Sequence, residues 1–197
     1  MNIACQQQNE QRTNMIILKH IVLASSLIAL GAQAQDRYMT RTGYISFHSE
    51  TPMETIHGDN RKVTSVWDAT TGAVEFAVLI KAFEFKKALM QEHFNENYME
   101  SNTFPKANFK GKVTGVTAEQ LKKPGTYDVV VEGELTMHGV TKPVKYKGTV
   151  TVDATGVKAN CDFGVKPGDY DIEIPSVVRD NIAEEIKVMV RMDYQKM

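Results

Sequence analysis

Apolar and polar residues alternate along several stretches of this chain, and this period of two constrains the fold more than any other feature. In the clearest stretch Tyr127, Val129, Val131, Leu135 and Met137 share one phase, while acidic and hydroxyl residues fill most of the other. Successive side chains of a strand point to opposite faces, so each stretch is predicted to be a strand with one buried and one solvated face. Two later stretches repeat the pattern, with the inward phases Val144, Tyr146, Val150 and Val152, and Ile182, Ile186, Val188, Val190, Met192 and Tyr194.

Short turn signals separate these stretches, which favours antiparallel neighbours. They include His138-Gly139, residues 153–156 and residues 166–169. Upstream, four more candidate strands lie at residues 38–49, 62–68, 73–84 and 107–116. About eight short strands separated by turns are typical of an all-β sandwich or barrel.

One segment breaks the alternation and predicts the single helix of the fold. Met90, Phe94 and Tyr98 recur every four residues, so residues 86–100 are expected to form an amphipathic helix of about three to four turns. A single helix on an antiparallel barrel would serve as a lid or a plug.

The N-terminus has the layout of a secretory signal peptide. Lys19 precedes an apolar run from residue 21 to residue 30, and Ala32-Gln33-Ala34 follows as a cleavage site. The run is too short to span a bilayer, which needs about 20 apolar residues. We therefore expect a signal peptide at residues 15–34, cleaved after Ala34, and one exported domain at residues 35–197. Residues 1–14 are interpreted as an upstream extension outside the fold, and the sequence leaves open whether Met1 or Met15 is the start.

The composition narrows the classes of partner. The chain is 42% hydrophobic and 24% charged, with a formal net charge of −1 and no run of Lys or Arg. These values are ordinary for a globular domain and give no electrostatic footprint for nucleic acid. We expect apolar or neutral partners, and a homodimer stays open because no sequence feature decides it.

Several motifs together resemble the YceI-like family of secreted lipid-binding proteins. The most specific is GELTMHGVTKPV at residues 133–144; the others are Asp162-Phe163-Gly164 and FNENY at residues 94–98 running into FPKANF at residues 104–109. The resemblance implies a lipocalin-like, eight-stranded antiparallel barrel whose lumen holds a long apolar chain, in some members a polyisoprenoid. It also implies a bacterial periplasm. Many members carry an Arg-Asp-x-His-Leu segment where this chain has KKALMQEHF at residues 86–94, so the headgroup of the ligand stays open.

Candidate ligand contacts follow from the inward phases of the strands and from the aromatic residues near the helix. Eight strands enclose a lumen that side chains just fill or that holds one slender ligand, so plain core packing is an equal alternative for each residue. The inward-phase candidates are Phe76, Val78, Ile80, Val129, Val131, Leu135, Val150, Val188 and Val190. The aromatic candidates around a tunnel entrance are Phe83, Phe85, Phe94, Tyr98, Phe104 and Phe109.

No catalytic or metal site is predicted. His48, His57, His93 and His138 show neither helical i, i+4 spacing nor close alternation on a strand, and no Cys-x-x-Cys occurs. Cys161 shares the inward phase of its strand and is expected to be a buried small hydrophobe rather than a reactive thiol.

Glu132 and Glu134 share a strand face, but Lys145 and Lys147 on the next strand favour a solvated ion-pair face over an acid/base pair. We expect a secreted, non-enzymatic protein without a cofactor that carries a polyisoprenoid or fatty acyl lipid. The alternative is a filled barrel that serves as an envelope stress or interaction module and binds a protein partner.

Overall fold

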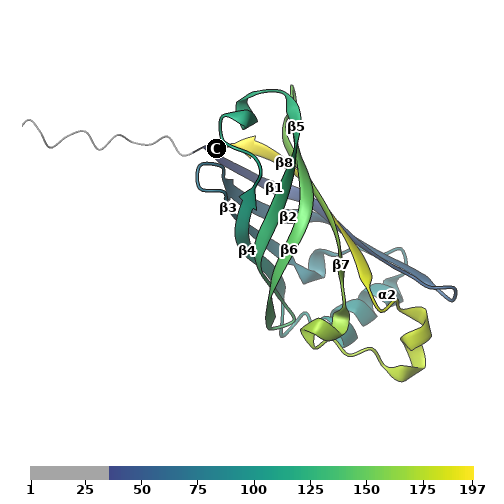
Figure 1. The fold of residues 1–197 in the computed structure, drawn as a ribbon. Helices are drawn as coiled ribbons and strands as arrows, with labels where there is room; N and C mark the ends of the chain where they lie inside the picture. Colours follow the sequence, from purple (N-terminus) through teal and green to yellow (C-terminus); the bar gives the residue numbers. More distant parts are fainter. Residues whose placement is uncertain (1–35) are drawn as a thin grey trace, which may run out of the picture. The chain divides into compact units, whose positions relative to one another are not determined.

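A computed structural model describes residues 36–197 (Figure 1). The predicted extension at residues 1–14 and the whole of the predicted signal peptide at residues 15–34, with its cleavage site, lie outside the described residues. The described chain forms a closed barrel in which each strand pairs antiparallel with the next and the last strand pairs with the first. This confirms the predicted all-β, eight-stranded antiparallel barrel. The strands are β1 (Arg37–Glu50), β2 (Thr55–Asp68), β3 (Ala73–Leu79), β4 (Lys106–Thr114), β5 (Gly125–Met137), β6 (Val140–Asp153), β7 (Gly156–Val165) and β8 (Ile186–Lys196).

The β5–β6 hairpin shows how the local sequence sets the register. Its two-residue turn, His138-Gly139, has positive φ at both positions (51° and 79°), which suits the twist of the flanking strands. This turn aligns Glu132 with Lys145, and their carboxylate and ammonium groups are 2.9 Å apart. The predicted cross-strand ion pair on the solvated face is therefore confirmed for these two residues.

A close backbone approach closes the barrel between β1 and β8. The β1 register shifts on both sides of Gly43, where the β1–β2 ladder bulges. A Cβ atom at Gly43 would lie 2.3 Å from the sulfur of Met192, a β8 residue that is only 1% exposed. Glycine at this position therefore lets Met192 fill the interior where the two ends of the sheet meet.

Three strand boundaries differ from the sequence prediction. β3 ends at Leu79 rather than at residue 84, because Pro105 precedes β4 and has no backbone N–H to extend the ladder. Instead the Ile80 N–H donates to the Pro105 carbonyl, and the chain turns into the 3₁₀-helix η1 (Ile80–Ala82). β2 begins at Thr55 rather than at residue 62, and β8 begins at Ile186 rather than at residue 182.

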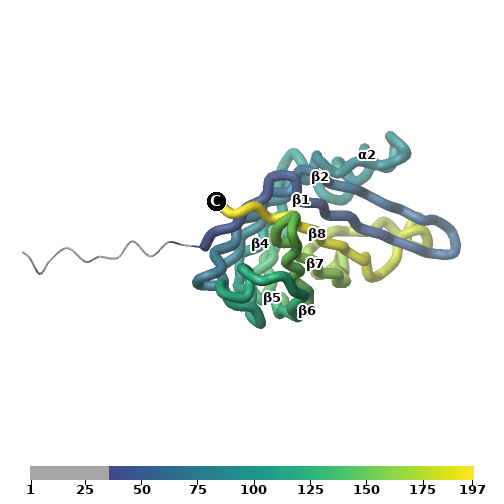
Figure 2. The backbone as a smooth tube through the Cα atoms, turned by 90° about the horizontal axis from the view of Figure 1, so that it is seen from above, coloured from purple at the N-terminus to yellow at the C-terminus, as the bar shows by residue number. Residues whose placement is uncertain are grey.

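The predicted helix is present but is not one regular α-helix. α2 (Ala88–His93) continues directly into a π-helical segment, η2 (Phe94–Tyr98). The long β7–β8 connection, which contains the 3₁₀-helices η4 (Pro167–Tyr170) and η5 (Ser176–Asn181), was predicted only as a turn. Figure 1 and Figure 2 place α2, the β1–β2 hairpin tip and this connection at the same end of the barrel, away from the C-terminus. We call this end the mouth.

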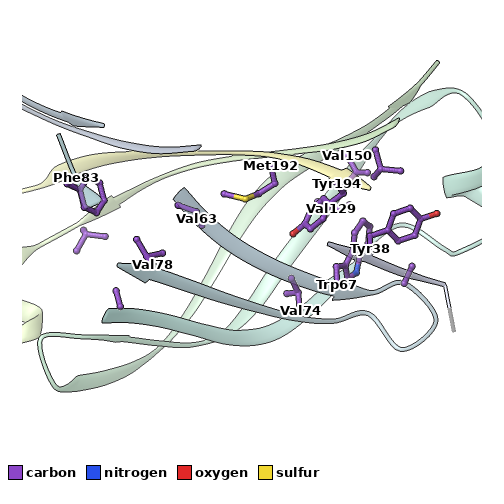
Figure 3. Close-up of a cluster of buried hydrophobic side chains, with 14 of the residues drawn as sticks. Tyr38, Val63, Trp67, Val74, Val78, Phe83, Val129, Val150, Met192 and Tyr194 are labelled. Carbon is purple, nitrogen blue, oxygen red and sulfur yellow. The ribbon is translucent and has the colours of Figure 1, made fainter. Parts of the chain in front are cut away.

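Aromatic side chains fill the opposite end of the barrel. Trp67 lies between Tyr38 and Tyr194, with ring centroids 5.9 Å and 5.8 Å away. The Tyr194 hydroxyl lies 2.7 Å from the Ser65 hydroxyl, and burial raises the pKa of Tyr194. Figure 3 shows the buried cluster extending from Tyr38 and Trp67 to Phe83. The barrel is therefore packed at the end opposite the mouth.

The buried Asn60 side chain predicts a measurable stability loss on truncation. Its Nδ2 group donates to the Leu79 carbonyl at 3.0 Å, and its Oδ1 atom accepts from the Lys62 N–H at 2.9 Å. Asn60→Ala should lower the free energy of unfolding by about 1–3 kcal/mol, since both backbone groups lose a partner. Chemical denaturation would measure the change. Asn102→Ala, which removes only an exposed bond to Lys81, is the matched control and should have little effect; equal effects would contradict this role of Asn60.

Candidate ligand-binding site

The interior holds two adjoining chambers. The inner chamber lies within the barrel, and almost all of its surface is contributed by apolar atoms of residues from all eight strands. The mouth chamber lies at the end closed over by α2 and the β7–β8 connection. The unfilled space is about 880 Å³ in the inner chamber and about 1450 Å³ in the mouth chamber, counting in each case the part open to solvent. Both chambers are lined by the same five residues where they meet, and we call this set the waist: Ile45, Val78, Ala107, Leu135 and Phe163.

The inward phases of the strands build the inner chamber. Val129 and Val131 on β5 line it, with Val150 on β6 and Val190 on β8. Tyr146 and Phe163 stack across β6 and β7 with ring centroids 4.1 Å apart and planes 15° from parallel. Branched residues of medium size leave space between opposite walls that a core of larger side chains would fill.

Four phenylalanines form a connected aromatic cluster in the mouth chamber. Phe94, on the π-helical segment, has its ring centroid 5.3 Å from Phe47, 5.5 Å from Phe83 and 5.0 Å from Phe85. Phe83 and Phe85 are the neighbours of Glu84, which forms an isolated β-bridge with Asp59. This bridge ties residues 83–85 to β2. Edge-on and tilted contacts of this kind favour a fixed arrangement of the rings. The π-helical segment thus positions Phe94 at the centre of an aromatic wall.

Polar side chains in the mouth chamber are few. Glu54, His93 and Asn181 line it among mainly aliphatic and aromatic residues. Lys87 bridges to Glu54 at 3.3 Å and so links the start of α2 to the β1–β2 hairpin. Burial raises the pKa of Tyr98, and the nearby Glu54 carboxylate adds to this shift. A ligand head at the mouth would therefore meet a few hydrogen-bonding side chains and one paired carboxylate.

The structure places every predicted contact except Phe104 in one of the two chambers. Phe104 instead packs on His138, with ring centroids 4.5 Å apart, because Pro105 directs the chain into β4 beyond it. Phe109 lies in the inner chamber against Phe76, not at the entrance. The inner chamber contains Phe76, Val78, Phe109, Val129, Val131, Leu135, Val150 and Val190; the mouth chamber contains Val78, Ile80, Phe83, Phe85, Phe94, Tyr98, Leu135 and Val188.

Sequence reasoning missed two groups of lining residues. Phe47 completes the aromatic cluster from β1, far from the helix in sequence. The β7–β8 connection contributes several aliphatic residues, and Ile182 belongs to this connection rather than to the last strand. The spacing of Ile172 and Ile174, two residues apart, could have indicated that this connection faces the interior. The lining residues of the connection are Pro167, Ile172, Ile174, Val178, Asn181 and Ile182.

Cys161 lines the inner chamber but is only partly buried. Its thiol lies 3.4 Å from the Lys147 carbonyl, to which it donates. Burial, together with the adjacent Asp162 carboxylate, raises the pKa of Cys161 to about 11. The thiol therefore stays protonated at neutral pH, which disfavours a nucleophilic role.

His48 and His57, which were not predicted to be neighbours, lie next to each other in the structure. Because β2 begins earlier than predicted, His57 pairs with His48 across β1 and β2. Among residues 36–197, no group of three or more His, Cys, Asp or Glu side chains is arranged to hold a metal ion. No helix in the same range has the length and apolar character needed to cross a bilayer.

Comparison with known proteins identifies the family. The family model of the YceI-like domain matches residues 39–194, which includes all eight strands of the barrel. The chain belongs to the YceI-like family. The comparison with curated proteins finds no match.

Solved structures share the fold of this YceI-like domain at low sequence identity. A polyisoprenoid binding domain from Saccharophagus degradans, implicated in plant cell wall breakdown, has a TM-score of 0.70 at 15% identity and covers 83% of this chain and 99% of its own. BcnA of Burkholderia cenocepacia has a TM-score of 0.63 at 15% identity, and the match covers 76% of this chain and 94% of BcnA. The Campylobacter jejuni YCEI protein has a TM-score of 0.55 at 12% identity, and the match covers 71% of this chain and 84% of the Campylobacter protein. These similarities establish the fold.

The raised pKa of Cys161 predicts slow alkylation of the folded YceI-like domain. The reactive thiolate forms only as the pH approaches about 11, so at pH 8 iodoacetamide should modify Cys161 roughly a hundredfold more slowly than in urea. The rate should rise as the pH rises toward 11. Peptide mapping by mass spectrometry would follow Cys161 separately from Cys5. Equal rates in the folded and unfolded protein would contradict this placement of the thiol.

Proposed function

We propose that this YceI-like protein is an exported, non-enzymatic binding protein that shelters one long apolar molecule of the polyisoprenoid or fatty acyl type. The observation that carries the proposal is the pair of apolar chambers joined at the waist. Together they offer a path for a chain from the aromatic wall of the mouth to Val129 and Val150 in the inner chamber. Export is proposed from the signal-peptide pattern at residues 15–34.

Simple energetics support an apolar chain as the ligand. Burial of each methylene is worth about 0.8 kcal/mol, so a chain of about a dozen carbons binds well without polar contacts in the inner chamber. Polar groups gather only at the mouth, where Glu54, His93 and Asn181 can meet a headgroup. The similarity to a polyisoprenoid binding domain supports this class of ligand.

Native mass spectrometry tests the proposal directly. The protein would be expressed with residues 1–34 present and released gently from the bacterial envelope. We expect a reproducible added mass that disappears on extraction with organic solvent, and its value would identify the ligand class. A bare polypeptide mass that does not change after incubation with polyprenyl and fatty acyl lipids would contradict the proposal.

A pair of adjacent substitutions distinguishes a tunnel from a filled core. Val131 lines the inner chamber, whereas Val130 lies on the opposite face of β5, across from Lys147 and Thr114. If the lumen is a tunnel, Val131→Phe should abolish lipid binding while changing the free energy of unfolding little. Val130→Phe should leave binding intact. A loss of about 1–3 kcal/mol in Val131→Phe, as overpacking produces, would instead favour the filled-barrel interaction module.

A further inference from the structure

We propose that His48 and His57 form a two-histidine site for a divalent transition-metal ion on the outer face of the barrel. The neighbours of His48 and His57 in the strands, Phe47 and Ile56, line the mouth chamber, so the two imidazoles project away from it. The β1–β2 register places the two residues opposite one another. The backbone ladder therefore holds the two side chains together without help from a ligand.

The two rings present their Nδ1 atoms side by side. These atoms are 3.0 Å apart, while the ring centroids are only 4.0 Å apart and the planes are inclined by 47°. This contact has the geometry of an N–H···N hydrogen bond in which one ring donates and the other accepts. The short distance between the centroids shows that the rings also overlap, so the bond is not end-on. A bound ion would replace the proton between the two nitrogens. This arrangement suits two donors that share a third atom.

A hydrogen-bonded chain orients His57 for coordination. Its Nε2 atom lies 2.8 Å from Oδ2 of Asp59, and the other oxygen of that carboxylate accepts from the Tyr44 hydroxyl. Arg61 lies over the Tyr44 ring, 4.5 Å from its centroid. When Nε2 of His57 donates to the carboxylate, its Nδ1 atom has the lone pair that can accept from Nδ1 of His48 or bind an ion. A histidine ligand that donates its second N–H to a carboxylate is the usual arrangement around protein-bound metals.

The spacing of the nitrogens indicates the class of ion. With metal–nitrogen bonds of about 2.0–2.1 Å, a separation of 3.0 Å corresponds to a bite angle of roughly 90–100°. This angle fits the tetragonal coordination of Cu²⁺ or Ni²⁺ better than a tetrahedral zinc site, and Cu²⁺ binds most tightly to such donors. Water completes the coordination, because the described residues offer no third side-chain ligand here. The His57 side chain is 27% exposed, so an ion can reach the pair from solvent.

The surrounding charges are nearly balanced. Lys187 on β8 lies opposite His48, whereas Glu50 follows two residues later on β1. Asp59 adds a second negative charge beside His57. The two carboxylates partly compensate the charge of a bound cation, and the partly exposed position of His57 and Asp59 lets the site exchange its ion with solvent.

Titration with Cu²⁺, followed by calorimetry and electron paramagnetic resonance, tests the site in the full chain. We expect one Cu²⁺ bound by two imidazole nitrogens, with weaker binding of Ni²⁺. His48→Ala and His57→Ala should each weaken Cu²⁺ binding at least about tenfold. Asp59→Asn, which keeps both ligands, should weaken it by roughly 10–100-fold. His138→Asn, which removes a histidine of the β5–β6 turn and keeps a residue that tolerates its positive φ, is the matched control and should leave Cu²⁺ binding unchanged.

The double variant His48→Ala/His57→Ala decides the outcome. Circular dichroism of each variant would verify that it is folded. Loss of the two-imidazole signal in the folded double variant would support the site. Binding that persists unchanged in this variant would assign the ion to other residues and overturn the proposal, as would the absence of stoichiometric Cu²⁺ binding to the unsubstituted protein.

Discussion

The pairing of β8 with β1 is the interaction on which the rest of the structure depends. It turns the sheet into a closed barrel, so that every strand has a neighbour on both sides and one of its faces becomes interior. Near this closure the missing side chain of Gly43 gives space to Met192. Once the sheet is closed, the inward phase of each strand has only the lumen to face, and the outward phase faces solvent.

Closure also explains why the same residues serve as core and as candidate site. At the end opposite the mouth, the large rings of Tyr38, Trp67 and Tyr194 pack together on the neighbouring strands β1, β2 and β8. Toward the mouth the walls carry mainly branched aliphatic residues, and the space between them stays partly unfilled. Protein interiors normally pack without such voids, and a lumen that does not collapse is therefore suited to a guest molecule. The aromatic wall around Phe94 then limits the access of solvent to the chambers.

The period-two alternation predicted the all-β class and most of the chamber lining, and the resemblance to the YceI-like family implied the closed eight-stranded barrel. Residues such as Val129, Val131 and Val190 could be assigned to the interior because each strand has only two faces. The ends of the strands were harder to predict. β3, for example, ends where its neighbour β4 is preceded by Pro105, a residue that lies in a different part of the sequence. The π-helical continuation of α2 likewise depends on the packing of Phe94 rather than on the spacing of its apolar residues.

Contacts between distant segments account for what the sequence did not predict. Phe47 joins Phe83, Phe85 and Phe94 only because β1 lies beside the folded-back segment after β3. The β7–β8 connection contributes to the mouth through isolated aliphatic residues without a regular period. His48 and His57 meet because β2 extends beyond its apolar stretch into the polar hairpin, where alternation of hydrophobicity is absent.

The central claim is that one apolar path runs through the waist between the two chambers. A crystal structure of the protein purified without removal of lipid would test it most directly. The account predicts continuous elongated electron density from the aromatic wall at Phe94, past Leu135 and Phe163, to Val129 and Val150. Side chains meeting across the waist, with no density in the inner chamber even after saturation with a polyprenyl lipid, would contradict it.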